Sequence, residues 1–136
     1  MPVVAAKKAV EISRSNNPKA AILEAIGDLS GEEILFNNIL VATYIRPART
    51  RGGILLPQSA TDEDQYQGKV GLVLKKGPDA FVSDDNIDFG TQNVEVGDWV
   101  VYRVGDGWPL AIRSTACRMI TDRSIRMRIK NPEDIF

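Results

Sequence analysis

Histidine is missing from this chain of 136 residues, and cysteine occurs once, as Cys117. Histidine is the commonest general base and the commonest metal ligand in proteins, so other side chains would have to fill both roles. A zinc site of the Cys/His type cannot be assembled within one chain, and neither can a Ser-His or Cys-His nucleophile pair. We therefore expect no enzymatic activity, no cofactor and no metal site.

Several other features are absent. The sequence has neither a Gly-x-Gly-x-x-Gly motif nor a Gly-x4-Gly-Lys-Ser/Thr motif, both of which bind phosphates. A single cysteine excludes an internal disulfide, which is typical of a reducing compartment. No apolar run reaches the length of a membrane span, and the N-terminus has no apolar signal-peptide core. We expect a cytoplasmic protein that makes no membrane contact.

The charge balance gives no sign of a nucleic-acid partner. The chain has 17 lysines and arginines against 18 aspartates and glutamates, a formal net charge of −1. Basic side chains in residues 46–51 and 126–130 could contact phosphates, but the first group has no interleaved aromatic residues on which bases would stack. A slightly acidic chain also lacks the electrostatic footprint of a nucleic-acid-binding protein, so we expect no nucleic-acid partner.

What the sequence does contain is a series of short strand-like runs divided by turn signals. Its length suits one domain with one core, and 43% apolar and 26% charged residues are typical of globular proteins. The runs cover residues 39–45, 69–74, 96–102, 108–112, 116–120 and 125–130. Many short strands separated by glycine-containing turns predict an all-β fold, either a small barrel or a sandwich.

The side-chain patterns of three runs predict their burial. Residues 39–45 are apolar on both alternating faces, which predicts a strand covered on both sides. Residues 68–74 alternate, which predicts a half-buried strand with Val73 on the side away from the core. Residues 125–130 alternate apolar and basic side chains, which predicts a closing strand with Met127 directed inward and the basic residues outward.

An N-terminal extension, residues 1–37, precedes these runs. Asn17 suits the N-cap position of a helix, and the proline after it suits the first helical position. Apolar residues then recur at helical spacing until Gly27, a natural stop. We expect a short helix over residues 18–26. Its apolar stripe would pack either on its own barrel or, as an arm, on a neighbouring subunit or another protein, and the sequence leaves both possibilities open.

A long polar connection with one apolar island joins the first two runs. Hairpin connections usually have only a handful of residues, and longer loops in compact domains are usually functional or disordered. The island consists of Gly52, Gly53, Ile54, Leu55 and Leu56. We predict that these five residues form a partner-binding segment on a flexible arm. The alternative is that the two glycines form a turn and the three apolar residues form a core strand.

The runs and the connection together resemble a known family. In chain order the sequence contains NNILVATYIRPARTRGGILLPQS, QGKVGLVLKKG and VEVGDWVVYR. Over residues 38–129 it resembles the GroES co-chaperonin family, and the stretches EDQYQGKVGLVLKKGPDAF and CRMITDRSIRMRIKNPED look like the phage-encoded branch. The resemblance implies a small irregular GroES-like β-barrel at residues 38–130 with a long loop after its first strand. The short helical extension precedes the barrel, and a tail at residues 131–136 follows it.

The resemblance also implies a function. GroES-type proteins are non-catalytic co-chaperonins that form homo-oligomeric rings and cap a GroEL-like chaperonin ring through mobile loops. Full burial of the three apolar side chains of the island would contribute about 1.5–3 kcal/mol each. Ordering the backbone costs about 1–2 kcal/mol per residue, so one arm alone would bind weakly and a ring would multiply the effect. Typical family members have no extension like residues 1–37.

A structural protein of a phage shell is the alternative. A capsid decoration or cement protein on the same barrel would bind a phage capsid protein and be located in the virion. Two features favour this alternative, because capping a chaperonin does not explain them. They are the N-terminal extension and the long acidic stretch of residues 78–93, which holds four aspartates. Their spacing differs from that of a calcium loop, so we expect a solvated tip anchored by Phe81 and Phe89.

Overall fold

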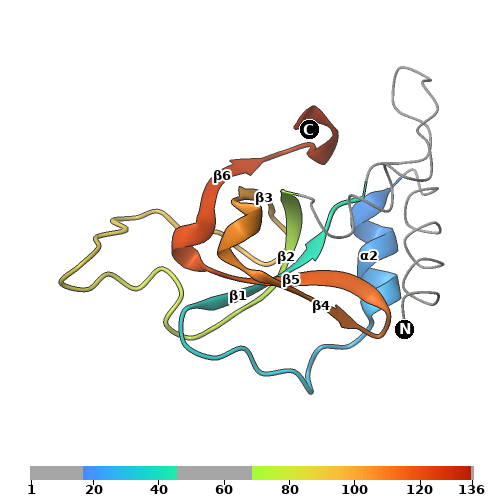
Figure 1. The fold of residues 1–136 in the computed structure, drawn as a ribbon, viewed down its shortest axis with the longest axis horizontal. Coiled ribbons are helices and arrows are strands. Elements are labelled where there is room, and N and C mark those ends of the chain that lie inside the picture. The colour runs from blue at the N-terminus through green and yellow to red at the C-terminus, as the bar shows by residue number, and fades with distance from the viewer. Residues whose placement is uncertain (1–16, 46–68, 136) are drawn as a thin grey trace.

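The computed structural model describes residues 17–45 and 69–135. Within these ranges one α-helix, six β-strands and three single-turn 3-10 helices follow one another (Figure 1). In chain order these elements are α2 (Pro18–Ile26), β1 (Asn38–Thr43), β2 (Val70–Lys76), β3 (Trp99–Tyr102), η1 (Val104–Asp106), β4 (Trp108–Ile112), β5 (Thr115–Thr121), η2 (Asp122–Ser124), β6 (Ile125–Ile129) and η3 (Pro132–Asp134).

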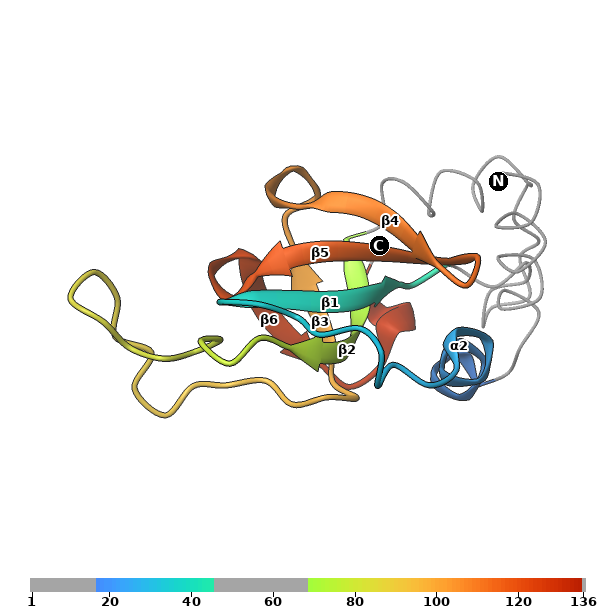
Figure 2. The ribbon, with the colours of Figure 1, turned by 90° about the horizontal axis from the view of Figure 1, so that it is seen from below.

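The strands form one antiparallel sheet in the order β4-β5-β1-β2-β3-β6. The register shifts between Leu40 and Val41 in β1 and between Val101 and Tyr102 in β3. Such irregularities bend a strand and increase its twist. Figure 2 shows the result: β4, β5 and β1 run side by side, while β2 and β3 cross them steeply. The predicted all-β, GroES-like small barrel is confirmed.

Strand β1 is covered on both faces, as its apolar pattern predicts. Leu40 and Ala42 belong to one buried cluster, and Ile39 and Val41 belong to a second cluster. All four side chains are fully buried. The first cluster includes residues of α2, and the second includes residues of β2, β3 and β5. The strand therefore separates two small cores.

Helix α2 packs on its own barrel, which decides between the two possibilities left open by the sequence. Its bounds match the predicted helix, because the Asn17 side chain accepts a hydrogen bond from the Ala20 amide and Gly27 ends the last turn. Ile22 and Ile26 are fully buried in the first core cluster. The helix thus covers one face of the sheet within the same subunit.

Two cations attach the segment after α2 to the barrel. Arg113 lies in the turn between β4 and β5 and donates hydrogen bonds to the carbonyl of Ile26 and to the Glu32 carboxylate. Lys75 Nζ donates to the carbonyls of Leu29, at 2.8 Å, and Glu32, at 2.7 Å. Of these three carbonyls, that of Ile26 belongs to the last turn of the helix, whose end leaves it without an intrahelical partner.

Two of the burial predictions are wrong. Val73 is fully buried, because its side chain packs in the second core cluster with Val94 and Val100. Met127, expected inside, is 51% exposed. It lies on β6, the last strand of the sheet order, where no further strand follows. Alternation along one strand does not indicate which neighbours cover each face.

Candidate partner-binding site

The predicted partner-binding residues Gly52, Gly53, Ile54, Leu55 and Leu56 lie outside the described residues. The structure does place the residues on either side of the stretch that contains that segment. Strand β1 leads into Tyr44 and Ile45, and the chain re-enters the described part at Lys69 and Val70. We call these four residues the anchor.

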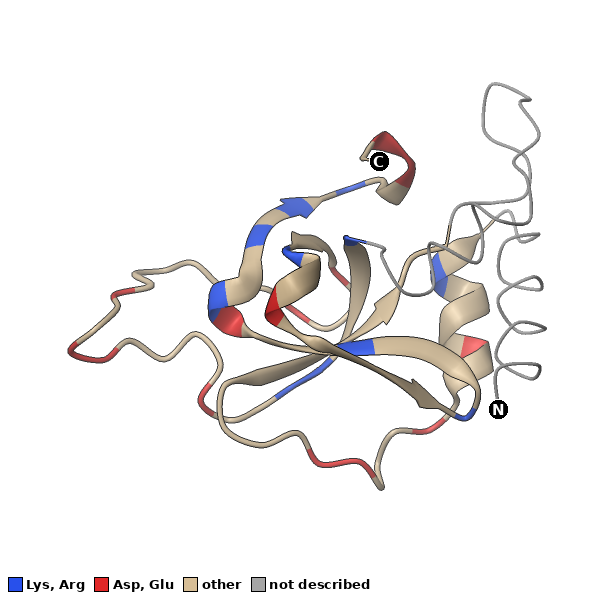
Figure 3. Ribbon diagram, in the orientation of Figure 1, with Lys and Arg blue, Asp and Glu red and all other residues tan. Residues whose placement is uncertain are grey.

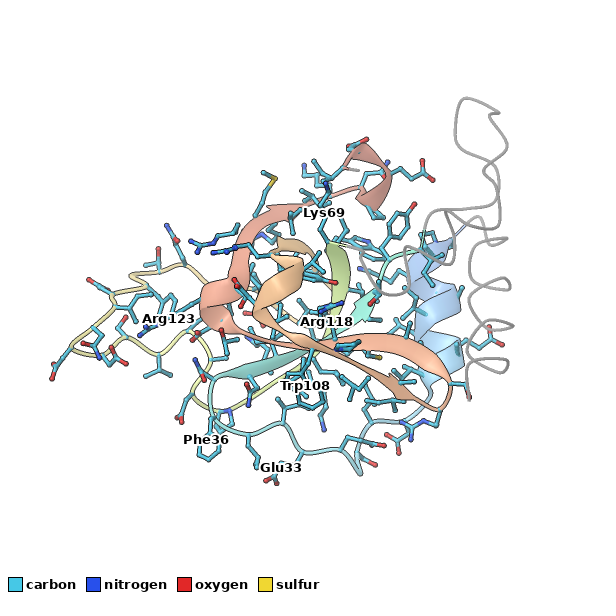
Figure 4. The ribbon with its side chains drawn as sticks, in the orientation of Figure 1. Glu33, Phe36, Lys69, Trp108, Arg118 and Arg123 are labelled. Atoms are coloured by element: carbon cyan, nitrogen blue, oxygen red, sulfur yellow. The ribbon has the colours of Figure 1, made fainter. Side chains whose placement is uncertain are left out.

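The anchor holds the start and the finish of the connection at the same end of the β1–β2 pair. The Tyr44 amide donates to the Val70 carbonyl at 2.8 Å, and the Tyr102 amide donates to the Lys69 carbonyl at 3.0 Å. Tyr44, Ile45 and Val70 are at most 2% exposed, whereas Lys69 faces solvent (Figure 4). The chain between residues 45 and 69 therefore starts and ends beside the hydrogen-bonded, buried pair Tyr44 and Val70.

An aromatic contact supports the anchor from the first core cluster. The rings of Tyr44 and Trp99 meet edge to face, with centroids 5.6 Å apart and planes at 80°. Such pairs contribute about 0.5–1.5 kcal/mol beyond their burial. Ile22 and Ile26 of α2 belong to the same cluster. The N-terminal helix and the anchor thus share one core.

A buried polar group lies on the opposite face of the sheet. Burial raises the pKa of Tyr102 to about 12, although the Arg118 guanidinium and the Thr43 hydroxyl act in the opposite direction. Arg118 donates to the Val104 carbonyl at 2.9 Å and is almost fully buried. At neutral pH the phenol keeps its proton, so it is unsuited to act as a general base.

Cys117, the single cysteine of the chain, is buried. Burial raises the pKa of the Cys117 thiol to about 12, so the nucleophilic thiolate does not form at neutral pH. Within residues 17–45 and 69–135 no three acidic or cysteine side chains converge in a way that could hold a metal ion. Backbone hydrogen bonds hold the chain on both sides of the connection at the anchor.

Sequence reasoning missed a groove of about 400 Å³ beside Phe36, which is lined by both apolar and polar side chains. Phe36, which is 67% exposed, and Val82, which is 56% exposed, contribute to its lining. Phe36 has a φ of 56°, unusual for a bulky residue. The buried Asp122 carboxylate holds the two walls together, because it accepts hydrogen bonds from Asn37 Nδ2 and the Phe81 amide. Figure 4 shows Phe36 pointing outward.

The fold defines the class of protein, which is that of the small GroES-like barrels. The barrel is antiparallel and six-stranded, and a long connection is anchored between its first two strands. No curated protein sequence matches the chain. The chain belongs to the Cpn10 family, described as the chaperonin 10 Kd subunit, because the family model matches residues 33–128 of the 136.

Family membership implies co-chaperonin function, a GroEL-like chaperonin as partner and assembly into an oligomeric ring. The matched stretch begins after α2, so the helix lies outside it. The described ranges contain no helix that is both long and apolar enough to cross a bilayer.

Proposed function

We propose that this protein is a non-catalytic co-chaperonin whose ring caps a GroEL-like chaperonin, and that residues 52–56 make the contact. The site of action would be the cytoplasm, or the host cytoplasm if a phage encodes the chain. The observation that carries the proposal is the anchor, which holds both ends of a 23-residue apolar-bearing connection at one end of the barrel of a Cpn10-family chain.

The anchor gives this mechanism a physical basis. The two ends of the connection are already held side by side in the folded subunit, so the entropy of loop closure is lost on folding and not on binding. Binding then has to order only the interior of the connection. Glycines such as Gly52 and Gly53 can adopt backbone conformations that other residues resist, which would suit folding on a partner. Burial of the next three side chains contributes about 1.5–3 kcal/mol each, most of it offset by ordering. A ring presenting several such segments would then bind much more tightly than one subunit.

The test is to replace Leu55 by aspartate. A charge in the apolar contact should weaken binding at least about tenfold, because a buried unpaired carboxylate adds to the lost apolar burial. Binding is measured as inhibition of the ATPase of a GroEL-like chaperonin and as capped complexes in electron micrographs. The matched control is Leu23→Asp, since Leu23 is an exposed leucine on α2. Equal binding by Leu55→Asp and the unchanged protein would show that the proposed contact is wrong.

A shell protein of a phage remains the second candidate, favoured by the acidic connection between β2 and β3, which projects from the barrel in Figure 1. The N-terminal helix no longer argues for it, since α2 packs on its own subunit. Mass spectrometry of purified virions separates the two candidates: abundant copies support the shell protein, and absence supports the lid.

A further inference from the structure

We propose that Arg118, Tyr102 and Thr43 position the anchor, so that side chains inside the barrel govern how residues 52–56 are presented to the chaperonin. We call these three residues the inner polar cluster. Their side chains are at most 4% exposed, so their role is exerted through other residues and not by touching a partner. The inference rests on the proposed function and extends it to residues outside the contact itself.

A charged residue is unusual at this place in the sheet. Among the described strands, β1, β3 and β4 contain no charged residue, and Arg118 is the one charged residue of β5 (Figure 3). Arg118 pairs across the strands with Val41, and paired residues share a face of the sheet. It therefore lies on the face of the second core cluster, which is built mainly from apolar side chains such as Val73 and Val100.

Hydrogen bonds connect Arg118 to the chain that follows β3. Arg118 Nη1 donates to the Val104 carbonyl at 2.9 Å and to the Gly107 carbonyl at 3.4 Å. These two carbonyls lie at the start of η1 and directly after it. The guanidinium thus connects β5 to the segment between β3 and β4, and it restrains the end of β3, where Tyr102 lies.

Tyr102 and Thr43 lie next to the two halves of the anchor. The Tyr102 amide donates to the Lys69 carbonyl at 3.0 Å, on the side where the chain re-enters the barrel. Thr43 immediately precedes Tyr44, whose amide donates to the Val70 carbonyl at 2.8 Å. Each half of the anchor is therefore held by a residue whose side chain belongs to the inner polar cluster.

The three side chains of the cluster are close to one another. The Arg118 guanidinium and the Thr43 hydroxyl both act to lower the pKa of the Tyr102 phenol, against the larger effect of burial, and such an effect requires proximity. Gly71, which pairs with Thr43, leaves room for the Tyr102 ring, since a Cβ there would lie 3.0 Å from the ring. The cluster thus joins β1, β2, β3 and β5 at the anchor.

Stability does not explain a polar cluster at this place. Apolar side chains of similar volume are often as stabilising as buried charged groups, or more so. Hydrogen bonds have a preferred direction and apolar contacts do not, so a polar cluster can select one arrangement of the strands that it joins. At the anchor such a selection serves binding. Segments presented from fixed positions in every subunit lose less entropy when a ring of them docks together.

Arg118→Met tests the inference, because methionine keeps an unbranched side chain and has no hydrogen-bond donor. In the free protein the backbone amides of Tyr44 and Tyr102 should exchange at least about tenfold faster, since their hydrogen bonds hold the anchor. The amides of Val73 and Gly77, which bond farther from the anchor, should keep their exchange rates. Capture by a GroEL-like chaperonin should weaken at least about fivefold, because a loosened anchor has more entropy to lose on binding.

Further variants separate positioning from a general loss of structure. Tyr102→Phe removes only a hydroxyl and should give the same pattern more weakly. Arg118→Lys keeps a charged donor and should restore part of the protection at the anchor. The matched control is Arg123→Met, which removes an exposed arginine on η2 and should change neither amide exchange nor capture.

Unchanged exchange at Tyr44 and Tyr102 in Arg118→Met would overturn the inference. Equal acceleration at Val73 and Gly77 would also overturn it, because the whole sheet would then be destabilised and not the anchor. A loosened anchor with unchanged capture would contradict the link to binding. Exchange is measured without chaperonin, so failure of the Leu55→Asp test would remove the proposed contact and leave the result at the anchor to be judged separately.

Discussion

At the scale of single residues, two glycines mark places where the chain approaches itself closely. A Cβ on Gly71 would lie 3.0 Å from the ring of Tyr102 and from Cβ of Val41. A Cβ on Gly77 would collide with the carbonyl oxygen of Phe36, a backbone atom that cannot rotate away. Gly77 therefore allows the chain before β1 to lie against the end of β2, and this contact forms one wall of the groove at Phe36.

Replacing Gly77 by alanine should destabilise the protein by about 1–3 kcal/mol, because the backbone must shift to remove the collision. The free energy of unfolding is measured in urea. Gly31→Ala is the control: nothing lies within 4 Å of a Cβ there, so a change within about 0.5 kcal/mol is expected. Equal effects of the two substitutions would contradict the close approach at Gly77.

Single residues also show where sequence reasoning stops. The sequence predicted the cap at Asn17 because the signal is local: the side chain bonds an amide three residues away. It failed for Val73 and Met127 because their burial depends on segments distant in the chain. The positive φ of Phe36 had no sequence signal of its own, since the residue type argues against that conformation.

At the scale of elements, α2 is the most informative. It precedes the stretch matched by the family model, yet two of its isoleucines are as buried as any in the barrel. Its bounds were predictable from an N-cap, a proline and a glycine. The surface on which α2 packs was not predictable, because an apolar stripe fits any apolar surface. The helix shares its core with Tyr44 of the anchor, so we regard it as part of the support for the partner-binding segment.

If α2 is part of the core, Ile22→Ala should lower the free energy of unfolding by about 2–5 kcal/mol, through lost burial and the cavity left behind. Leu23→Ala on the same helix should change it much less, because that side chain is 45% exposed. Chemical denaturation of both variants provides the comparison. Small and equal effects would mean that the helix is detached from the barrel in solution.

At the scale of the whole molecule, the all-β class and the GroES-like barrel were predictable because the strand pattern and three ordered motifs agree with each other. The sequence did not predict the order of the strands in the sheet, because that order depends on pairing between distant segments. It also did not predict the grooves at Phe36 and along β6, because side chains from segments far apart in the chain line each groove. The role of residues 52–56 stays a prediction, because those residues lie outside the described part.

The most direct test of the central claim is hydrogen exchange of the backbone amides, measured with and without a GroEL-like chaperonin and adenine nucleotide. Docking of residues 52–56 should slow exchange within that segment on addition of the chaperonin, while the barrel strands, already protected by their ladders, change little. Unchanged exchange in residues 52–56, with new protection on another surface or none at all, would contradict the account.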